Sequence, residues 1–244
     1  MSLRSAIVAL VSLALAVICV SVALAAELID EPEPVSPPAA VPAPPPPEPI
    51  PVEPAPQPTN GPQPLTDVPV RWRESRAVGK PFAGKLVDGV ELPAGGRDYF
   101  TWDSELKRTP SRAWRRHGTD RLVATLLQVL SQYRAANPEA PRVGIGDLSR
   151  PNGGSFDERF GGLGHSSHQN GLDADVFYPR TDRAERRPYT PPLVDRRLAQ
   201  DLVDRFVAAG ARYVFVGPRL ALRGPRKVVS PLRHHDDHLH VRLR

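Results

Sequence analysis

The segment GHSSHQNGLDADVFYP, residues 164–179, carries the pattern on which the fold of this chain depends. In its second half, Asp173 and Asp175 alternate with apolar residues, as in a strand with two different faces. Gly171 precedes this strand and can turn the chain, which brings His168 at the mouth of the loop back toward the strand. We therefore expect both carboxylates on one face of a strand, with a histidine close to them.

A second polar segment, HHDDHLH, occupies residues 234–240 close to the C-terminus. In extended backbone His238 and His240 point to the same side, while the apolar residues that follow them suit a core. Two imidazoles and one carboxylate that converge on a point are the ligand set of a catalytic zinc site, with a fourth position left for water. Thiolate ligands are excluded from this site, since the only cysteine is Cys19 near the N-terminus.

The remaining pattern predicts an α+β domain with a small antiparallel sheet and flanking helices. Apolar residues at helical spacing predict helices over 119–136 and 193–209. Glycine- and proline-rich stretches predict loops over 79–97 and 151–164. The order of elements is not a regular βαβ alternation, which favours α+β over α/β. The predicted strands are 143–146, 172–178, 213–216 and 239–243.

The N-terminal part of the chain predicts export. Residues 1–26 combine Arg4, an uncharged apolar run and small residues at a cleavage position, which is typical of a signal peptide. The apolar run over residues 5–26 is also long enough for an uncleaved anchor that tethers the protein to a membrane. Both alternatives place the remainder outside the cytoplasm, in the periplasm or cell wall.

A proline-rich linker is expected over residues 27–68, followed by one domain over 69–244. Sixteen of the 30 prolines lie between residues 32 and 64, a density that favours extended polyproline II structure. Residues 65–244 hold 31 basic and 21 acidic residues, and such a basic exported domain suits an anionic cell-envelope polymer. Nucleic acid is not the expected partner, because basic and aromatic residues do not interleave. The sequence leaves the oligomeric state open.

The two histidine segments together resemble the penicillin-insensitive murein endopeptidases. The resemblance lies in His-Ser-Ser-His-Gln-x-Gly-Leu-Asp-x-Asp and the later Asp-His-x-His-Val-Arg-Leu. These proteins are zinc peptidases of peptidoglycan, related to the D-Ala-D-Ala carboxypeptidases and to the hedgehog-type fold. The resemblance implies zinc ligation by His168, Asp175 and His240, with His238 facing the water and the substrate carbonyl.

Position 235 separates two branches of these enzymes. The carboxypeptidase branch carries a glutamate three residues before the His-x-His, whereas this chain has His235, which matches the endopeptidase branch. His165, three residues before His168, is a candidate for an extra ligand or a substrate contact. One zinc site is expected, because no histidine occurs between Asp175 and the 234–240 segment.

The expected activity is hydrolysis of stem-peptide crosslinks, with a D-Ala–diaminopimelate bond as the first candidate and no sensitivity to β-lactams. His238 and His235 would share proton transfer, and Asp173 would orient a ligand histidine. Arg150 is a candidate contact for a substrate carboxylate. The alternatives are a zinc D-Ala-D-Ala-type carboxypeptidase and a non-catalytic module that binds the cell wall. The isolated His117 is expected to be a surface residue.

Overall fold

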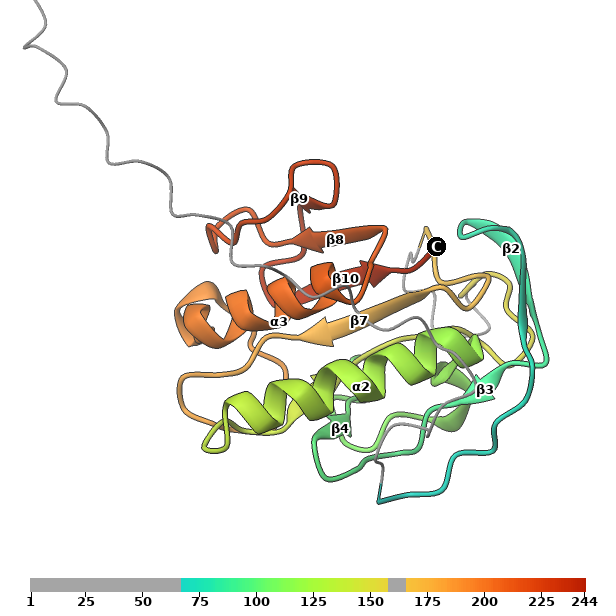
Figure 1. The fold of residues 1–244 in the computed structure, drawn as a ribbon, viewed down its shortest axis with the longest axis horizontal. Helices are drawn as coiled ribbons and strands as arrows, with labels where there is room; N and C mark the ends of the chain where they lie inside the picture. The colour runs from blue at the N-terminus through green and yellow to red at the C-terminus, as the bar shows by residue number, and fades with distance from the viewer. Residues whose placement is uncertain (1–66, 158–165) are drawn as a thin grey trace, which may run out of the picture. The chain divides into compact units, whose positions relative to one another are not determined.

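A six-stranded sheet with the order β4-β6-β7-β10-β8-β9 organises the described part of the computed structural model, residues 67–157 and 166–244 (Figure 1). The three central pairings are antiparallel, whereas β4 with β6 and β8 with β9 are parallel. The predicted α+β class is confirmed, and the expected antiparallel sheet has parallel pairs at its two edges. The strands are β4 (Tyr99–Thr101), β6 (Val143–Ile145), β7 (Asp173–Phe177), β10 (His238–Arg242), β8 (Tyr213–Val216) and β9 (Val229–Pro231).

Helices α2 (Asp120–Ala136) and α3 (Arg196–Ala208) lie side by side against the sheet (Figure 1). Thr119 caps α2, since its hydroxyl accepts a hydrogen bond from the Leu122 amide at 3.1 Å. Asp195 caps α3 in the same way through the Leu198 amide. The predicted helix over 119–136 is therefore confirmed, and α3 begins later than the predicted residue 193.

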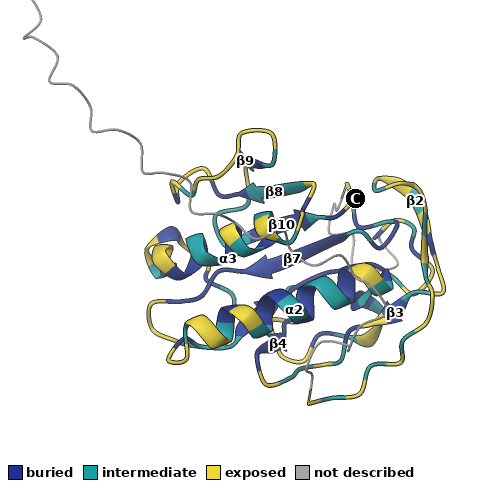
Figure 2. Cartoon of the chain, viewed as in Figure 1, coloured by how far each residue is buried: buried dark blue, intermediate teal, exposed yellow. Residues whose placement is uncertain are grey.

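The apolar faces of both helices and of the central strands form one core. Figure 2 shows the inward surfaces of α2 and α3 as buried and their outward surfaces as exposed. Leu126 and Phe206 from the helices, and Val176 and Val241 from β7 and β10, are fully buried in it. This packing fixes the two central strands that also carry the predicted ligands.

A hairpin replaces the first part of the loop predicted over residues 79–97. Strands β1 (Arg76–Lys80) and β2 (Ala83–Val87) pair with each other, and β3 (Val90–Glu91) pairs with β5 (His117–Gly118). Glycines inside the strands weakened the strand pattern in this region. The hairpin ends near Phe82, whose side chain is 56% exposed. His117 is half-buried in β5, so its prediction as a surface residue is wrong.

The other predicted strands differ from the observed ones by at most one residue at each end, and 213–216 agrees fully. The later start of α3 has a local cause, because Pro191–Leu193 form a separate 3-10 turn ahead of the Asp195 cap. A further short 3-10 turn lies at Ala113–Arg115. Of the loop predicted over 151–164, residues 151–157 contain neither helix nor strand, and residues 158–164 lie outside the described residues.

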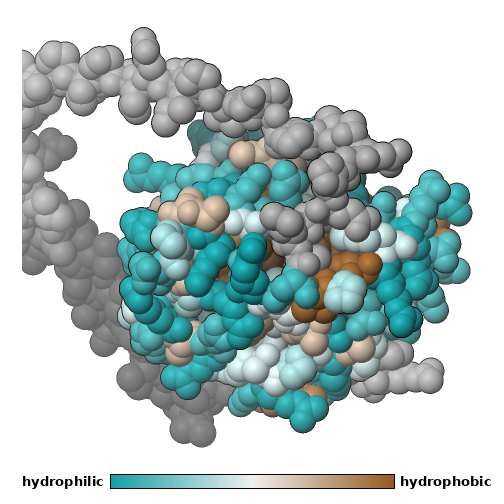
Figure 3. Space-filling model, turned by 60° about the horizontal axis from the view of Figure 1, so that its bottom comes forward, coloured by the Kyte–Doolittle hydropathy of each residue, from teal (hydrophilic) through white to brown (hydrophobic). Residues whose placement is uncertain are grey.

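The described surface is mainly hydrophilic on the face in Figure 3, with a few hydrophobic groups between polar ones. None of the helices in residues 67–157 and 166–244 is both long and apolar enough to cross a membrane. The predicted export segment 1–26, with Cys19, and residues 27–66 of the predicted linker lie outside the described residues.

Candidate metal centre

The register between β7 and β10 brings the two polar segments together. His240 lies directly opposite Asp175, and Arg242 lies opposite Asp173. Directly opposed residues of an antiparallel pair share one face of the sheet. A slip of one residue would turn these side chains toward the apolar core, so the packing of β7 and β10 also fixes the polar face.

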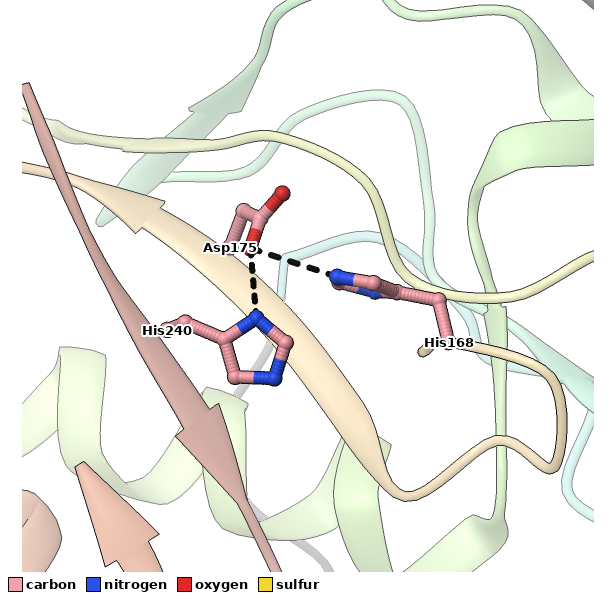
Figure 4. A group of neighbouring side chains, drawn as sticks. All are labelled: His168, Asp175 and His240. Atoms are coloured by element: carbon pink, nitrogen blue, oxygen red, sulfur yellow. Dashed lines mark ion pairs between the residues drawn. The ribbon is translucent and has the colours of Figure 1, made fainter. Parts of the chain in front are cut away.

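His168 reaches this face from the loop before β7 (Figure 4). Its backbone has a φ of 67°, in the left-handed region, and Gly171 follows with a φ of 76°. A Cβ atom at Gly171 would lie 2.7 Å from the Leu86 side chain and 3.1 Å from the Thr119 amide nitrogen. Glycine is therefore required where the loop passes the hairpin and the cap of α2, and the tight loop places His168 beside β7.

His168, Asp175 and His240 converge, and one ligand atom from each lies within 4.8 Å of the others. All three side chains are buried. Figure 4 shows both histidine rings pointing toward the Asp175 carboxylate. The distances to Asp175 Oδ1 are 3.4 Å from His168 Nε2 and 3.2 Å from His240 Nδ1.

The outer nitrogen of each histidine is held by an acceptor, which defines the tautomer. His168 Nδ1 lies 2.8 Å from the Leu148 carbonyl oxygen, and His240 Nε2 lies 2.7 Å from Asp173 Oδ1. A carbonyl and a carboxylate only accept hydrogen bonds, so these nitrogens donate. In the neutral imidazoles the lone pairs of His168 Nε2 and His240 Nδ1 therefore point at Asp175.

The two inner histidine nitrogens and Asp175 Oδ1 are three acceptor atoms that face one another, an arrangement that suits a cation. Asp175 Oδ1 is buried and makes no hydrogen bond within the described residues. Burial acts to raise the pKa of Asp175, but the adjacent His168 and His238 outweigh it and hold this pKa well below its ordinary value. An ionised carboxylate and two imidazole nitrogens form the donor set that zinc prefers. The residues present thus fit a metal ion.

Asp173 supports the centre from behind His240. Its carboxylate is fully buried and also accepts a hydrogen bond from Arg242 Nε at 2.6 Å. A carboxylate that holds the outer nitrogen of a ligand histidine fixes the ring and increases its basicity. Burial acts to lower the pKa of His240, but the carboxylates of Asp173 and Asp175 outweigh burial and raise this pKa above its ordinary value. Metal binding at Nδ1 would therefore release a proton.

His238 lies next to this group and is oriented by a residue that the sequence analysis missed. Its Nδ1 lies 2.6 Å from Asp237 Oδ1, and its Nε2 lies 3.7 Å from Asp175 Oδ1. Arg187 Nε in turn donates to Asp237 Oδ2 at 2.6 Å. The position of Asp237 directly before His238 was the available signal, although adjacency in sequence alone does not predict a hydrogen bond.

His235 stands in the turn before β10, and its ring lies 4.6 Å from that of His238, centre to centre. Its Nδ1 donates to the Arg233 carbonyl at 2.8 Å, which leaves Nε2 with a lone pair. Burial and the neighbouring His238 lower the pKa of His235 to about 4, so its ring is neutral at neutral pH. The neutral ring therefore offers Nε2 as a hydrogen-bond acceptor in the wall of the centre.

The centre opens into a cavity of about 860 Å³. His168, Asp175, His238 and His240 lie in its wall together with His235. Ser166 and Ser167 also line it, as do residues that the sequence analysis did not consider: Phe82, Phe215, Leu232 and Arg233. This volume is in the range of small-molecule sites and gives a substrate access to the converging histidines.

Two other predicted site residues lie apart from this group. Arg150 donates to the Ser155 carbonyl at 2.7 Å and is not among the residues that line the cavity. His165 lies outside the described residues. The expected contact of Arg150 with a substrate carboxylate stays a prediction, as does the role of His165.

Comparison with known proteins finds one family. A sequence model of the family described as "Penicillin-insensitive murein endopeptidase" matches residues 77–212, which include His168 and Asp175. Proteins named penicillin-insensitive murein endopeptidase from Salmonella heidelberg (strain SL476) and Salmonella paratyphi C (strain RKS4594) are each 30% identical over 196 residues. These matches cover 70% of this chain and 66% of each relative.

Proposed function

Because the chain belongs to the penicillin-insensitive murein endopeptidase family, we propose that it is a zinc-dependent hydrolase that cleaves peptide crosslinks in peptidoglycan. The observation that carries this proposal is the convergence of His168, Asp175 and His240 within 4.8 Å in the wall of a large cavity. The printed names of the relatives support the substrate class.

His168, Asp175 and His240 would hold the zinc ion, with Asp173 keeping His240 in the tautomer that presents Nδ1. Bound zinc polarises a carbonyl group and lowers the pKa of water to about 7. The ionised state of Asp175 favours binding of a divalent cation, and His240 would release a proton from Nδ1 as the ion binds.

His238 and His235 would carry the proton transfers of the hydrolysis. His238 presents Nε2 to the cavity, and Asp237 stabilises the imidazolium that forms when this nitrogen takes a proton from water. The proton then passes to the amine of the leaving residue, so that the imidazole returns to its neutral form. His235, neutral and 4.6 Å from His238 between ring centres, is placed to share this transfer as a hydrogen-bond partner.

The proposed bond is the D-Ala–diaminopimelate crosslink of the stem peptides. The mechanism uses no serine nucleophile, so β-lactams, which acylate such a serine, are expected to leave the rate unchanged. Ser166 and Ser167 are read as loop residues of the cavity wall. Export through residues 1–26, a spacer over 27–68 and action in the periplasm or cell wall, with or without a membrane anchor, are part of the same proposal.

The test is digestion of purified crosslinked sacculi, followed by mass analysis of the muropeptides. We expect dimers to be converted to monomers, the conversion to stop with a chelator, and zinc to restore it. Benzylpenicillin should have no effect. An unchanged muropeptide profile with zinc-loaded protein would contradict the proposal.

The same assay separates the two alternatives. Release of free D-alanine from monomeric stem peptides, without loss of dimers, would identify a carboxypeptidase. Binding to sacculi that persists after chelation, without any cleavage, would identify a binding module. A mixed profile of dimer cleavage and D-alanine release would show that the cavity accepts both bonds.

A further inference from the structure

We propose that Arg233 binds a free carboxylate of the substrate, on the residue that supplies the amine of the scissile bond. This inference rests on the proposed function, since it names a recognition element for the same cavity. It concerns a residue of the turn between β9 and β10 that lies outside the metal centre itself.

Arg233 is an exposed cation in the wall of the cavity. Within residues 67–157 and 166–244 its guanidinium has neither a hydrogen-bond partner nor an ion-pair partner, in contrast to the other arginine of this wall, Arg242, which donates to Asp173. A guanidinium presents a planar fork of donors that matches a carboxylate in a bidentate arrangement. Arg233 is therefore the cation of this cavity that is available to an anionic ligand.

Three carboxylates of the turn and of β7 are already bound by other arginines. They cannot serve as the counterion of Arg233 without losing a partner, so they leave its positive charge in the cavity wall uncompensated. The pairs are Asp236 with Arg219 at 2.6 Å, Asp237 with Arg187 at 2.6 Å, and Asp173 with Arg242 at 2.6 Å.

A side-chain hydrogen bond ties the backbone of the turn at Arg233 to His235. The Arg233 carbonyl accepts a hydrogen bond from His235 Nδ1 at 2.8 Å, and His234 between them has a φ of 67°. A histidine tolerates this left-handed conformation better than most residues other than glycine. The turn thus links the backbone of Arg233 to the ring of His235, and both residues lie in the wall of the same cavity.

The chemistry of the proposed substrate supplies the matching anion. In a D-Ala–diaminopimelate crosslink, the diaminopimelate centre that provides the amine also carries a free carboxylate, two bonds from the scissile nitrogen. A cation beside the proton-transfer histidines would bind this carboxylate while the amide lies at the metal centre. Amidation of that carboxylate removes the charge and leaves the scissile bond intact, so it separates recognition from chemistry.

The experiment compares the carboxylate form of a crosslinked dimer with the same dimer amidated at that position, using the zinc-loaded full-length protein. For the wild type we expect kcat/KM to be about tenfold higher for the carboxylate form, as for a hydrogen-bonded charge pair at a partly exposed site. Arg233→Gln should abolish this preference, and Arg233→Lys should keep only part of it. Arg226→Gln removes an exposed arginine outside the cavity and should behave as the wild type.

A binding measurement separates this inference from the proposed function. Calorimetry with the uncrosslinked stem peptides, in carboxylate and amide forms, should give the same tenfold preference in Kd for the wild type and none for Arg233→Gln. Such binding without any cleavage would leave the inference standing and contradict the proposed function. Cleavage with a preference that Arg233→Gln retains, or a wild type without preference in either assay, would overturn the role of Arg233.

Discussion

The histidines of strand β10 and of the turn that precedes it differ in their burial and in the groups that they contact. His240 in β10 is buried, opposes Asp175 across the sheet, and has both ring nitrogens next to carboxylates. His235 in the turn contacts only a backbone carbonyl through its Nδ1, and Arg233 beside it has no side-chain partner within the described residues. The sheet therefore forms the candidate cation site, whereas the turn presents side chains that can contact a substrate.

The difference follows from how each part is held. Side chains on β7 and β10 are positioned by strand register and by a core on the other face of the sheet, so the ligand atoms do not depend on solvent-exposed contacts. The turn at residues 232–237 is mostly polar, with residues 232–234 exposed and residues 235–237 half-buried. Variants of the sheet should therefore change metal content, and variants of the turn should change catalysis or substrate affinity at constant metal content.

The largest effect is expected for His240→Ala. Loss of one ligand removes the zinc site, and with it several kcal/mol of charge stabilisation, so the rate of dimer cleavage should fall by about 10³-fold or more. Zinc content, measured by atomic emission on the purified protein, should fall in parallel. His234→Asn is the matched control for zinc content, because His234 lies in the same segment outside the ligand set and asparagine tolerates its left-handed backbone. Full zinc content in His240→Ala would contradict the assignment of His240 as a metal ligand.

The next effect is expected for His235→Ala in the turn. Removal of a group that shares proton transfer should lower kcat by about 10²-fold while zinc content stays at the wild-type level. This outcome separates His235 from the ligands of the sheet. If zinc content and activity fell together, His235 would belong to the metal centre, and the division between the strand and the turn would be wrong.

A smaller effect is expected for Asp173→Asn. The amide keeps the shape of the carboxylate, but it weakens the hold on His240 Nε2 and on Arg242. Zinc affinity should fall about 10- to 100-fold, as for other groups that orient a ligand histidine. The rate should largely recover at saturating zinc, which competition with a fluorescent chelator can establish. A loss of rate that zinc does not restore would assign Asp173 a direct part in catalysis.

The sequence predicts the sheet side of this comparison much better than the turn. Alternation in residues 172–178 and 239–243 defines which side chains share a face, and the glycine at 171 signals the loop that returns His168. The hydrogen bonds that select the histidine tautomers cannot be deduced from the spacing of residues in the sequence. The pairs His168–Leu148 and His238–Asp237 were therefore not predicted. Both depend on contacts between elements or on side-chain rotamers.

The cavity wall was harder to predict for a different reason. The hairpin of β1 and β2 carries glycines at 79 and 84, which reduce its strand signal, so Phe82 fell within a predicted loop. Arg233 is one of many arginines in a basic chain, and its position directly before the 234–240 segment does not by itself predict that it lines the cavity. Only the folded arrangement shows that it does.

Phe82 provides the smallest and most specific test of the comparison, since it belongs to neither the sheet nor the turn. The residue is 56% exposed at the tip of the β1–β2 hairpin, and it lines the cavity together with Leu232 of the turn. An aromatic ring that is half-exposed before binding gains apolar contact when a substrate covers it. Phe82→Ala should therefore raise KM by about threefold to tenfold, with unchanged kcat and zinc content. The matched control is Val78→Ala, an exposed apolar residue of the same hairpin that does not line the cavity. A fall in kcat with constant KM would instead show that the hairpin positions the reacting groups, and an equal effect of Val78→Ala would assign it to hairpin stability.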